Sequence, residues 1–373
     1  MPPSPRTCAG LIAALALLAP AAAGKEPRTR TGDGARDALR GEAIEEALRY
    51  LERTQKLDGS WGRPAEGGVG ITALCLLAFF AQGHQEHRGP YGSLLHRGVK
   101  YLMAKSLPPS ERDPALAGGG KPTGYIFDHN DRDSRMHGHG YATQVLVLAY
   151  GAGRAQDPHT HELKRKVQLA IRVIENSQTF TGGWGYEPSH STFHEGSVTV
   201  TAVQALRLAR DAGFIVDEAV QKQGLEYLKQ SQKDDGSFKY SLGQDHTTSA
   251  LTAAAITAMY GFGQYYGDSI RKGLSFLRSQ YRHPDYVDWP HYGNYYAAQA
   301  FWRSGGPDWD LWSGTVIPHL LRTGIRDSER PGVLCWDDSD SSRAPRSHGR
   351  DYATALTVLA LSVEDGYLPI FQK

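Results

Sequence analysis

The sequence predicts an all-α protein built as an α6/α6 toroid, in which six outer helices surround six inner helices. Two kinds of helical segment alternate along the chain, one amphipathic and charged, the other nearly apolar, and each kind occurs six times. A helix that is apolar on all sides must be buried, and an amphipathic neighbour can cover it. No segment has the atypical composition of a capping repeat, so a closed ring is favoured over an open solenoid.

The amphipathic segments share a small residue, two spacers and then a pair of bulky apolar residues, as in Ala47-x-x-Tyr50-Leu51. Lys, Arg and Glu lie between the apolar positions, which is typical of a helix with one face in water. A pattern that recurs at intervals of this length is the signature of a repeat architecture. The outer helices are expected near 37–54, 92–106, 160–177, 217–232, 267–280 and 308–322.

The second kind of segment is rich in Ala and Thr and contains few charges, as in Tyr352-Ala353-Thr354-Ala355. Small side chains allow neighbouring helices to approach closely. These segments should therefore form the inner ring. They are expected near 69–82, 139–151, 196–212, 246–262, 293–304 and 350–363.

The composition is that of an ordinary globular protein with enough apolar residues for a core. The chain has 373 residues, of which 40% are hydrophobic and 22% charged, and its formal net charge is +1. Because 41 basic residues are balanced by 40 acidic ones, no basic field exists to hold a phosphate backbone, and nucleic acid is not expected as a partner. Cysteine pairs with metal-site spacing are absent, so neither a metal nor a cofactor is predicted, although scattered histidines leave metal binding open.

The first 23 residues have the pattern of a signal peptide. Arg6 precedes an apolar run over 9–18, and Ala21-Ala22-Ala23 provides a cleavage site. Residues 24–36 are expected to be a flexible leader, and residues 37–373 a single domain. No run is long enough to span a bilayer, so the protein is expected to be exported to the periplasm or the exterior.

Removal of the signal peptide would leave two cysteines, Cys75 and Cys335. Closure of the ring would bring the first inner helix near the loop before the sixth, where a disulfide is one possibility in an exported protein. The alternative is that Cys75 is a small core residue on an apolar helix face.

Several stretches resemble the squalene-cyclase and protein-prenyltransferase superfamily. The segment Gln55-Lys56-Leu57-Asp58-Gly59-Ser60-Trp61 matches the Gln-Trp repeat of triterpene cyclases. Secreted bacterial prenyltransferase/squalene oxidase repeat proteins resemble this chain at 137–143, 291–297 and 367–372. The resemblance implies a toroid in which the Gln ends an outer helix and the aromatic residue packs on it. Such pairs are Gln55 with Trp61, Gln178 with Trp184, and Gln232 with Phe238.

Three chemistries of that superfamily lack their key residues in this chain. The Asp-x-Asp-Asp run of alkene-protonating cyclases is missing, and Asp337-Asp338-Ser339-Asp340 has a different order in a polar loop. In protein prenyltransferases the zinc-binding Asp is followed two residues later by Cys, whereas Asp351 is followed by Ala353. The Cys-Gly-Glu-Gln run of complement-type thioester domains is also missing. A repeat of this kind indicates the fold more strongly than any reaction.

The candidate site lies where the inner helices begin. The outer-to-inner connections are long, notably 107–138 and 323–349, and long loops on a rigid scaffold are where binding residues concentrate. Helix N-termini also favour anionic or polar groups. The following residues are expected to line one cavity: His137, His139, Tyr141, His194, Glu195, Asp245, His246, His291, Tyr292, Tyr295, His348, Asp351 and Tyr352.

Each of these residues also has a structural interpretation. Asp245 and Asp351 fit helix N-caps, tyrosines between helix layers are usually core residues, and a single histidine is often held by hydrogen bonds. If the site is catalytic, the candidates are His139, Glu195, Asp351 and Tyr352.

Three functions remain open at this level. The first is an exported protein that binds a polar or amphipathic ligand, or a partner peptide, in a cavity lined by His, Tyr and acids. The second is a glycan-active lyase or hydrolase that uses a Tyr or His base, or Glu195 and Asp351 as paired carboxylates. The third is a divergent terpenoid or prenyl-transferring enzyme.

Overall fold

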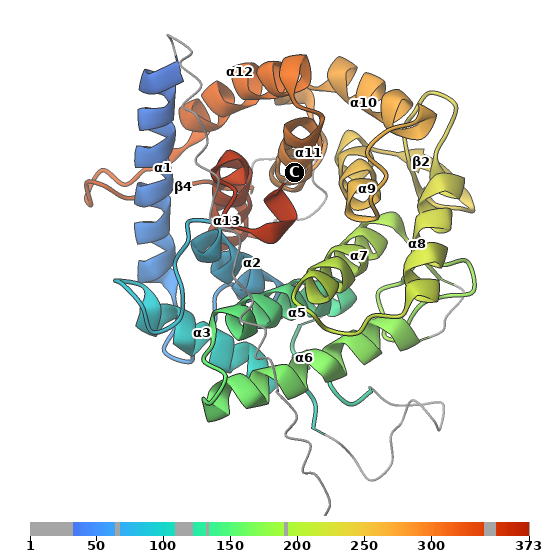
Figure 1. Ribbon diagram of the computed structural model, residues 1–373. Coiled ribbons are helices and arrows are strands. Elements are labelled where there is room, and N and C mark those ends of the chain that lie inside the picture. Colours follow the sequence, from blue (N-terminus) through green and yellow to red (C-terminus); the bar gives the residue numbers. More distant parts are fainter. Residues whose placement is uncertain are drawn as a thin grey trace, which may run out of the picture.

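The protein forms two concentric rings of helices, as a computed structural model describes for residues 33–63, 68–108, 122–131, 134–189, 193–338 and 348–372. The predicted signal peptide and most of the predicted leader lie outside these residues. The outer ring in Figure 1 contains α1 (Asp33–Thr54), α3 (Gly92–Lys105), α6 (Pro158–Asn176), α8 (Glu218–Ser231), α10 (Asp268–Gln280) and α12 (Gly306–Thr323). The inner ring contains α2 (Gly68–Phe80), α5 (Arg135–Ala152), α7 (Gly196–Asp211), α9 (Ser249–Gly261), α11 (Pro290–Ser304) and α13 (Arg350–Leu361).

The inner ring closes on itself. Each inner helix packs against the next in the order α2, α5, α7, α9, α11 and α13, and α13 packs back against α2. Every residue of α2 and of α9 is buried, as their nearly uniform apolar composition requires. The predicted all-α toroid and its alternation of outer and inner helices are confirmed.

The predicted boundaries differ from the observed ones at several helix starts, and α11, for example, begins at Pro290 and not at 293. α1 begins at Asp33, so residues 33–36 are helical and do not belong to a flexible leader. α9 begins at Ser249, because a short antiparallel hairpin of β1 (Lys239–Ser241) and β2 (Gln244–Thr247) precedes it. α5 begins earlier than expected, at Arg135. The remaining elements are 3-10 helices η2 (Pro284–Tyr286), η3 (Val363–Asp365) and η4 (Pro369–Phe371), and the strand pair β3 (Ile325–Arg326) and β4 (Leu334–Cys335).

The glutamine-aromatic turns join neighbouring hairpins through hydrogen bonds. Trp184 Nε1 donates to the carbonyl of Ile174 near the end of α6, at 2.7 Å. Gln178 Nε2 donates to Gly182 O at 2.8 Å and to Val220 O in α8 at 2.9 Å. The corresponding glutamines make the same two kinds of bond, Gln55 to Gly59 and Leu94, and Gln232 to Gly236 and Ser269.

A glycine with positive φ allows each turn to touch the next outer helix. Gly182 has φ 88°, and a Cβ atom there would lie 2.3 Å from Gln223 O. Only glycine fits this left-handed backbone and this close approach. Gly59 and Gly236 occupy the equivalent positions, against Arg97 and Lys272 respectively.

The first and last hairpins meet along a polar seam. Arg40 on α1 donates to Leu361 O at 2.7 Å and makes a forked pair with Asp365 at 2.9 and 3.0 Å. Cys75 and Cys335 are both buried and unpaired, so no disulfide ties this seam. The alternative assignment of Cys75 to an apolar helix face fits its complete burial on α2.

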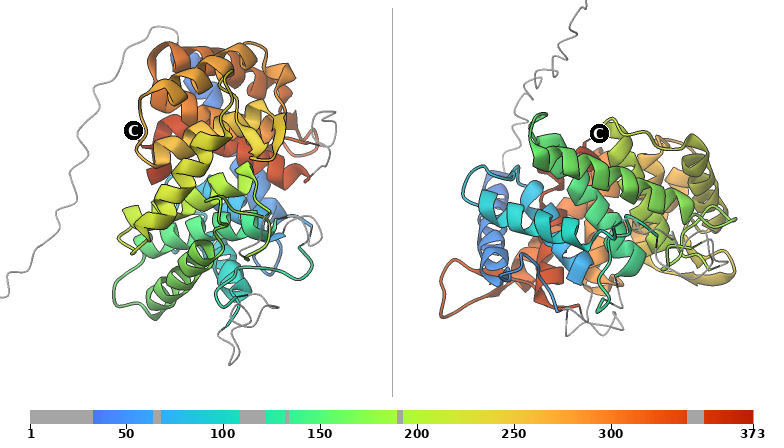
Figure 2. Two further views of the ribbon diagram at one scale, coloured as in Figure 1. Left: turned by 90° about the vertical axis from the view of Figure 1, so that its right-hand side faces the viewer. Right: turned by 90° about the horizontal axis from the view of Figure 1, so that it is seen from below.

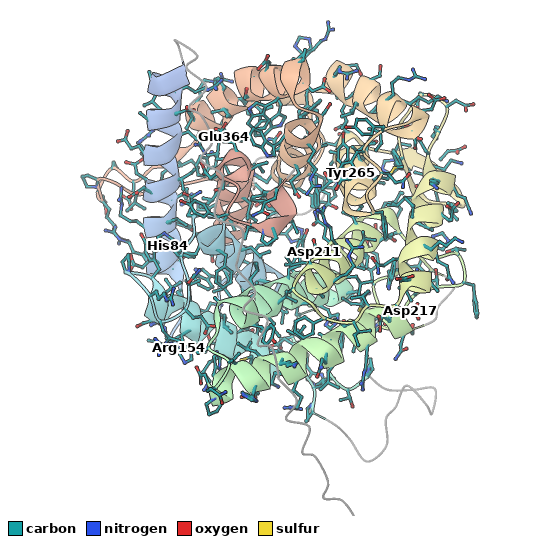
Figure 3. The ribbon with its side chains drawn as sticks, in the orientation of Figure 1. His84, Arg154, Asp211, Asp217, Tyr265 and Glu364 are labelled. Carbon is teal, nitrogen blue, oxygen red and sulfur yellow. The ribbon has the colours of Figure 1, made fainter. Side chains whose placement is uncertain are left out.

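The chain's last described segment covers one end of the ring. In Figures 1 and 2 the C-terminus lies at the mouth of the inner ring, where η4 packs against α7 and Tyr295 contacts Phe371. Arg303 donates to Ile370 O at 2.7 Å and fixes this segment. The inner-to-outer connections are on the same side, and Figure 3 labels residues such as Arg154, Asp217 and Tyr265 around it. No helix among the described residues is both long and apolar enough to cross a membrane.

Replacing Gln178 with Ala should lower the free energy of unfolding by about 1–2 kcal/mol, because two buried carbonyls lose their donor. The matched control is Gln168→Ala on the exposed face of α6, the helix that precedes Gln178, which should change stability by less than about 0.5 kcal/mol. Urea denaturation of both variants measures the difference. Equal effects would show that the bridge between hairpins does not contribute.

Candidate functional site

Three inner helices each carry two aromatic side chains one turn apart at their N-terminal ends. The pairs are His137 with Tyr141 on α5, Tyr292 with Tyr296 on α11, and His348 with Tyr352 at the start of α13. Residues four apart lie on one helix face, and the rings within the second and third pairs are 4.7 and 4.8 Å apart. These six residues are called the tyrosine-histidine cluster below.

The deeper level of the cluster closes the ring interior. Tyr141 Oη and Tyr296 Oη are 3.1 Å apart and share a hydrogen bond. Because α5 and α11 are three positions apart in a ring of six, this bond crosses the axis. Farther down, Gln204 on α7 donates to Gln299 on α11 at 3.1 Å. Side chains therefore fill the axis below the cluster, and a ligand has access only from the N-terminal side.

The shallower level is partly open and contains an unsatisfied polar atom. His137, Tyr292, His348 and Tyr352 are all half-buried. Among the described residues, Tyr292 Oη is buried without a hydrogen-bond partner. An unpaired buried hydroxyl costs about 1–3 kcal/mol, and the Tyr296 side chain offers this atom only a weak interaction. A small movement of the neighbouring rings that admitted a ligand oxygen would therefore stabilise it.

Burial keeps the tyrosine hydroxyls neutral. It raises the pKa of Tyr141, Tyr292, Tyr296 and Tyr352, and burial is the largest cause for each of them. A hydroxyl with a raised pKa donates and accepts hydrogen bonds at neutral pH but does not act as a base. The cluster is thus a set of neutral hydroxyls and aromatic faces.

Glu195 lies next to His137, and its carboxylate oxygens already accept hydrogen bonds from residues of α7. Its carboxylate is completely buried and caps α7, accepting from Ser197 N at 3.0 Å and from Val198 N at 2.6 Å. Ser197 Oγ also donates to it, at 2.7 Å. The carboxylate serves its own helix, and His137 Nε2 approaches it to 3.4 Å.

Two hydroxyl groups lie within hydrogen-bond distance of the His137 ring nitrogens. Ser197 Oγ donates to Glu195 and lies 3.0 Å from His137 Nε2. Thr201 Oγ1 donates to Ser197 O and lies 3.3 Å from His137 Nδ1. These contacts fix the orientation of the His137 ring at the mouth of the cluster.

Two aromatic residues that the sequence analysis missed extend this group. Tyr186 Oη and Tyr240 Oη are hydrogen-bonded at 2.6 Å, and the Tyr186 ring centre is 6.0 Å from that of His137. Phe193, which is 45% exposed, stacks on Tyr186 at 5.7 Å. Both tyrosines lie in turns or hairpins outside the helical repeats, where no periodicity marks them.

Several predicted cavity residues point elsewhere. His139 is completely buried between the rings: its Nδ1 accepts from Ile126 N and its Nε2 donates to Ala170 O of α6, both at 3.1 Å. In other hairpins the equivalent backbone N–H donates to a threonine hydroxyl of the inner helix, as Trp184 N does to Thr199 Oγ1. In this hairpin His139 takes the place of the threonine and accepts from Ile126 N. His139 is therefore placed as a structural residue.

His194 and Asp351 are also directed away from the cluster. His194 Nδ1 lies 3.0 Å from the hydroxyl of Tyr227 on the outer helix α8. Asp351 accepts from Gly62 N at 3.0 Å, in the turn after α1. Because Glu195 caps α7 and Asp351 bonds to the α1–α2 connection, these carboxylates do not form the pair considered for a glycosidase.

The other four predicted residues are dispersed. Asp245 and His246 lie on the exposed strand β2, where Asp245 pairs with Lys239 at 3.0 Å and caps no helix. His291 lies between α11 and α13, near Thr357 Oγ1 at 3.1 Å. Tyr295 is fully buried against the C-terminal segment. The expectation that His139, Glu195, His246, His291 and Asp351 face one cavity is wrong.

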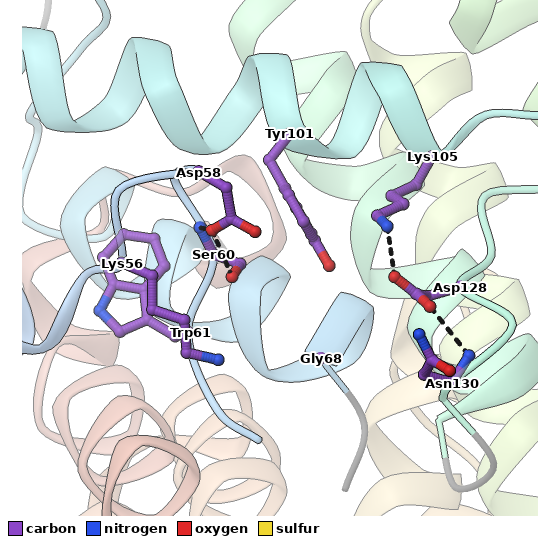
Figure 4. A pocket seen from close by; sticks show the side chains of 9 residues that line it. All are labelled: Lys56, Asp58, Ser60, Trp61, Gly68, Tyr101, Lys105, Asp128 and Asn130. Carbon is purple, nitrogen blue, oxygen red and sulfur yellow. Dashed lines mark hydrogen bonds and ion pairs between the residues drawn. The ribbon is translucent and has the colours of Figure 1, made fainter. Parts of the chain in front are cut away.

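A separate pocket of about 260 Å³ lies between α3 and the start of α2 (Figure 4). It is lined by Lys56, Asp58, Ser60, Trp61, Gly68, Tyr101, Lys105, Asp128 and Asn130. Its charged groups are largely engaged: Lys105 pairs with Asp128, Lys56 donates to Gly62 O, and Asp58 accepts from Ser60. A pocket below the usual size range of ligand sites, with its charges satisfied, is a weaker candidate than the cluster.

The acidic loop before α13 also has a structural role where it is described. Asp338 accepts from the backbone N–H groups of His348 and Gly349 at 2.7 and 2.9 Å, and Asp337 pairs with Arg350 at 2.9 Å. Ser339 and Asp340 lie outside the described residues.

Solved structures with similar folds belong to enzymes of two kinds. The type II terpene cyclase MstE from Scytonema, bound to geranylgeranyl dihydroxybenzoate, is 15% identical, with a TM-score of 0.55 over 90% of this chain and 99% of that one. An inactive α-1,6-mannanase from Salegentibacter sp. HEL1_6, bound to α-1,6-mannotriose, is 9% identical, with a TM-score of 0.57 over 88% and 98%. No protein-family model matches the chain, and no curated protein matches it in sequence. At these identities the likeness establishes the α/α-toroid fold and no function.

His139 should make folding sensitive to acid. Burial lowers its pKa from 6.5 to about 4, so between these values the unfolded chain takes up a proton that the folded protein does not. The free energy of unfolding is therefore at its full value above about pH 6.5 and falls by at most about 1.4 kcal/mol per pH unit as the pH drops towards 4.

His139→Gln, which can keep one acceptor and one donor, should reduce this dependence when denaturation is compared at about pH 7 and about pH 5. The control is His161→Gln, because His161 is exposed on α6. An unchanged pH slope in His139→Gln would contradict the assignment.

Proposed function

We propose that the protein is an exported binding protein for a neutral, hydroxyl-rich ligand such as an oligosaccharide, held at the N-terminal side of the inner ring by the tyrosine-histidine cluster. The observation that carries the proposal is the half-buried Tyr292, whose hydroxyl has no partner among the described residues. A ligand hydroxyl would satisfy it, while the faces of neighbouring aromatic rings would cover the ligand's apolar surface.

The shape of the site supports an extended ligand that binds from outside. The Tyr141–Tyr296 hydrogen bond closes the axis, so the interior offers no room at that level for a folded polyene chain. Two described residues of the outer-to-inner connections, Tyr186 and Tyr240, lie beside the cluster and extend its aromatic surface. The α-1,6-mannanase that shares the fold binds α-1,6-mannotriose, which makes that sugar a suitable first probe.

Binding is favoured over catalysis because the carboxylates are engaged. Glycoside hydrolysis commonly needs two carboxyl groups that flank the bond, whereas Glu195 caps α7 and Asp351 bonds to Gly62 N. The buried tyrosines are neutral, which disfavours them as bases. Export remains part of the proposal and rests on the signal-peptide pattern of residues 1–23. An intact mass that corresponds to a chain beginning near Gly24, measured on protein purified from its source, would support removal of a signal peptide and hence export.

A second candidate function is a glycan-active enzyme, and one specific observation favours it. His137 approaches the buried carboxylate of Glu195 to 3.4 Å and is itself half-buried, so it could exchange a proton with a bound substrate. Incubating the protein with oligosaccharides and measuring new reducing ends separates the two functions. Products in molar excess over protein would establish the enzyme, and intact sugar with saturable binding would establish the binder.

Tyr292→Phe should weaken the binding of a neutral oligosaccharide by about two- to tenfold, the equivalent of one hydrogen bond. The variant should fold as well as the wild type, because it removes a buried hydroxyl that has no partner. Calorimetric titration with a panel that includes α-1,6-mannotriose measures the effect.

The control is Tyr281→Phe. Tyr281 is also a buried tyrosine whose hydroxyl has no partner among the described residues, but it packs against Phe301 away from the cluster. This variant should bind as the wild type does. Absence of binding across the panel, or equal losses in both variants, would overturn the proposal.

A further inference from the structure

Four chemically active side chains gather on the outside of the ring, at the end opposite the tyrosine-histidine cluster. Glu86 and His87 lie in the connection between α2 and α3, His96 is on α3, and His159 is in the first turn of α6. This end contains the inner-to-outer connections, and Figure 3 labels His84 and Arg154 in the connections that flank the group. The proposed function does not use any of the four.

Donor atoms from three of these residues converge. His96 Nδ1 lies 3.0 Å from Glu86 Oε1, and His159 Nε2 lies 3.2 Å from the same oxygen. One ligand atom from each residue lies within 4.8 Å of the others. With metal–ligand bonds of about 2.0–2.1 Å, neighbouring donors in a tetrahedral zinc site are about 3.3 Å apart, so the two nitrogen–oxygen distances fit that geometry.

We propose that Glu86, His96 and His159 bind one divalent transition-metal ion of the zinc class. Two imidazole nitrogens and one carboxylate oxygen are the donor set that such ions prefer over calcium or magnesium. Three protein ligands leave a fourth position for water. The bound ion would join the α2–α3 connection to α6, two hairpins that are neighbours in the ring.

The surroundings suit a metal better than a hydrogen-bonded trio alone. The Glu86 side chain is only 7% exposed, and a buried carboxylate needs a cation or several hydrogen-bond donors beside it. A metal cation between the three side chains would offset the buried charge of Glu86. It would also bind the lone pairs of His96 Nδ1 and His159 Nε2.

The backbone also holds the group in place. His87 adopts a left-handed conformation with φ 59°, which is uncommon for a residue other than glycine and tends to occur at functional sites. Its ring packs 4.3 Å from that of His96, which restricts the imidazole that would ligate.

Titrating the full-length mature protein, after chelator treatment, with Zn²⁺ in a calorimeter tests the site. The wild type should take up one ion per chain and melt several degrees higher with the metal than without it. Co²⁺ in place of Zn²⁺ should give the visible absorption of a low-symmetry, four-coordinate site.

His159→Ala and Glu86→Gln should lose saturable uptake or weaken it at least tenfold, together with the cobalt absorption and the thermal shift. The matched control is His161→Ala, which removes an exposed histidine two residues along the same helix and should bind like the wild type. Metal-free melting curves show whether each variant is folded, and His96→Gln replaces any variant that is not. Absence of one-to-one uptake by the wild type, or undiminished uptake by the ligand variants, would overturn the proposal.

Discussion

Two of the inner helices, α2 and α9, have no polar face, and this constraint determines the rest of the structure. Because α2 and α9 are buried over their whole length, each needs a helix on both flanks, a helix outside and a filled axis inside. A closed ring is the arrangement that supplies all four. The glutamine-aromatic turns set the spacing between hairpins, and the bonds of Arg40 to Leu361 and Asp365 complete the circle.

The axis explains why the two faces differ. At one end the C-terminal segment fills the opening, with Phe371 against Tyr295. At the other end the tyrosines of α5 and α11 meet across the ring, and the polar side chains above them remain half-buried. The toroid is thus a closed scaffold whose two ends differ: the C-terminal segment fills the axis at one end, and the other end has a partly open aromatic level.

The architecture could be predicted from the sequence because it depends on periodicity, which is local. All twelve α-helices among the described residues were expected, with errors at boundaries where a hairpin or an early turn intervened, as before α9. The candidate site was harder to predict from the sequence, because side chains at equivalent positions of the repeats need not point in the same direction. His137 and His139 are two residues apart on α5, so they face opposite sides of the helix: one faces the cluster and the other bonds to α6. Tyr296 and Ser197 were missed because their roles depend on contacts between helices.

The seam has a consequence for how the chain acquires its structure. The Arg40 side chain bonds to a carbonyl 321 residues further along, so α1 and α2 cannot be fully covered until almost the whole protein has been made. Contacts between such distant residues form slowly, and the first hairpin must keep apolar surface exposed meanwhile.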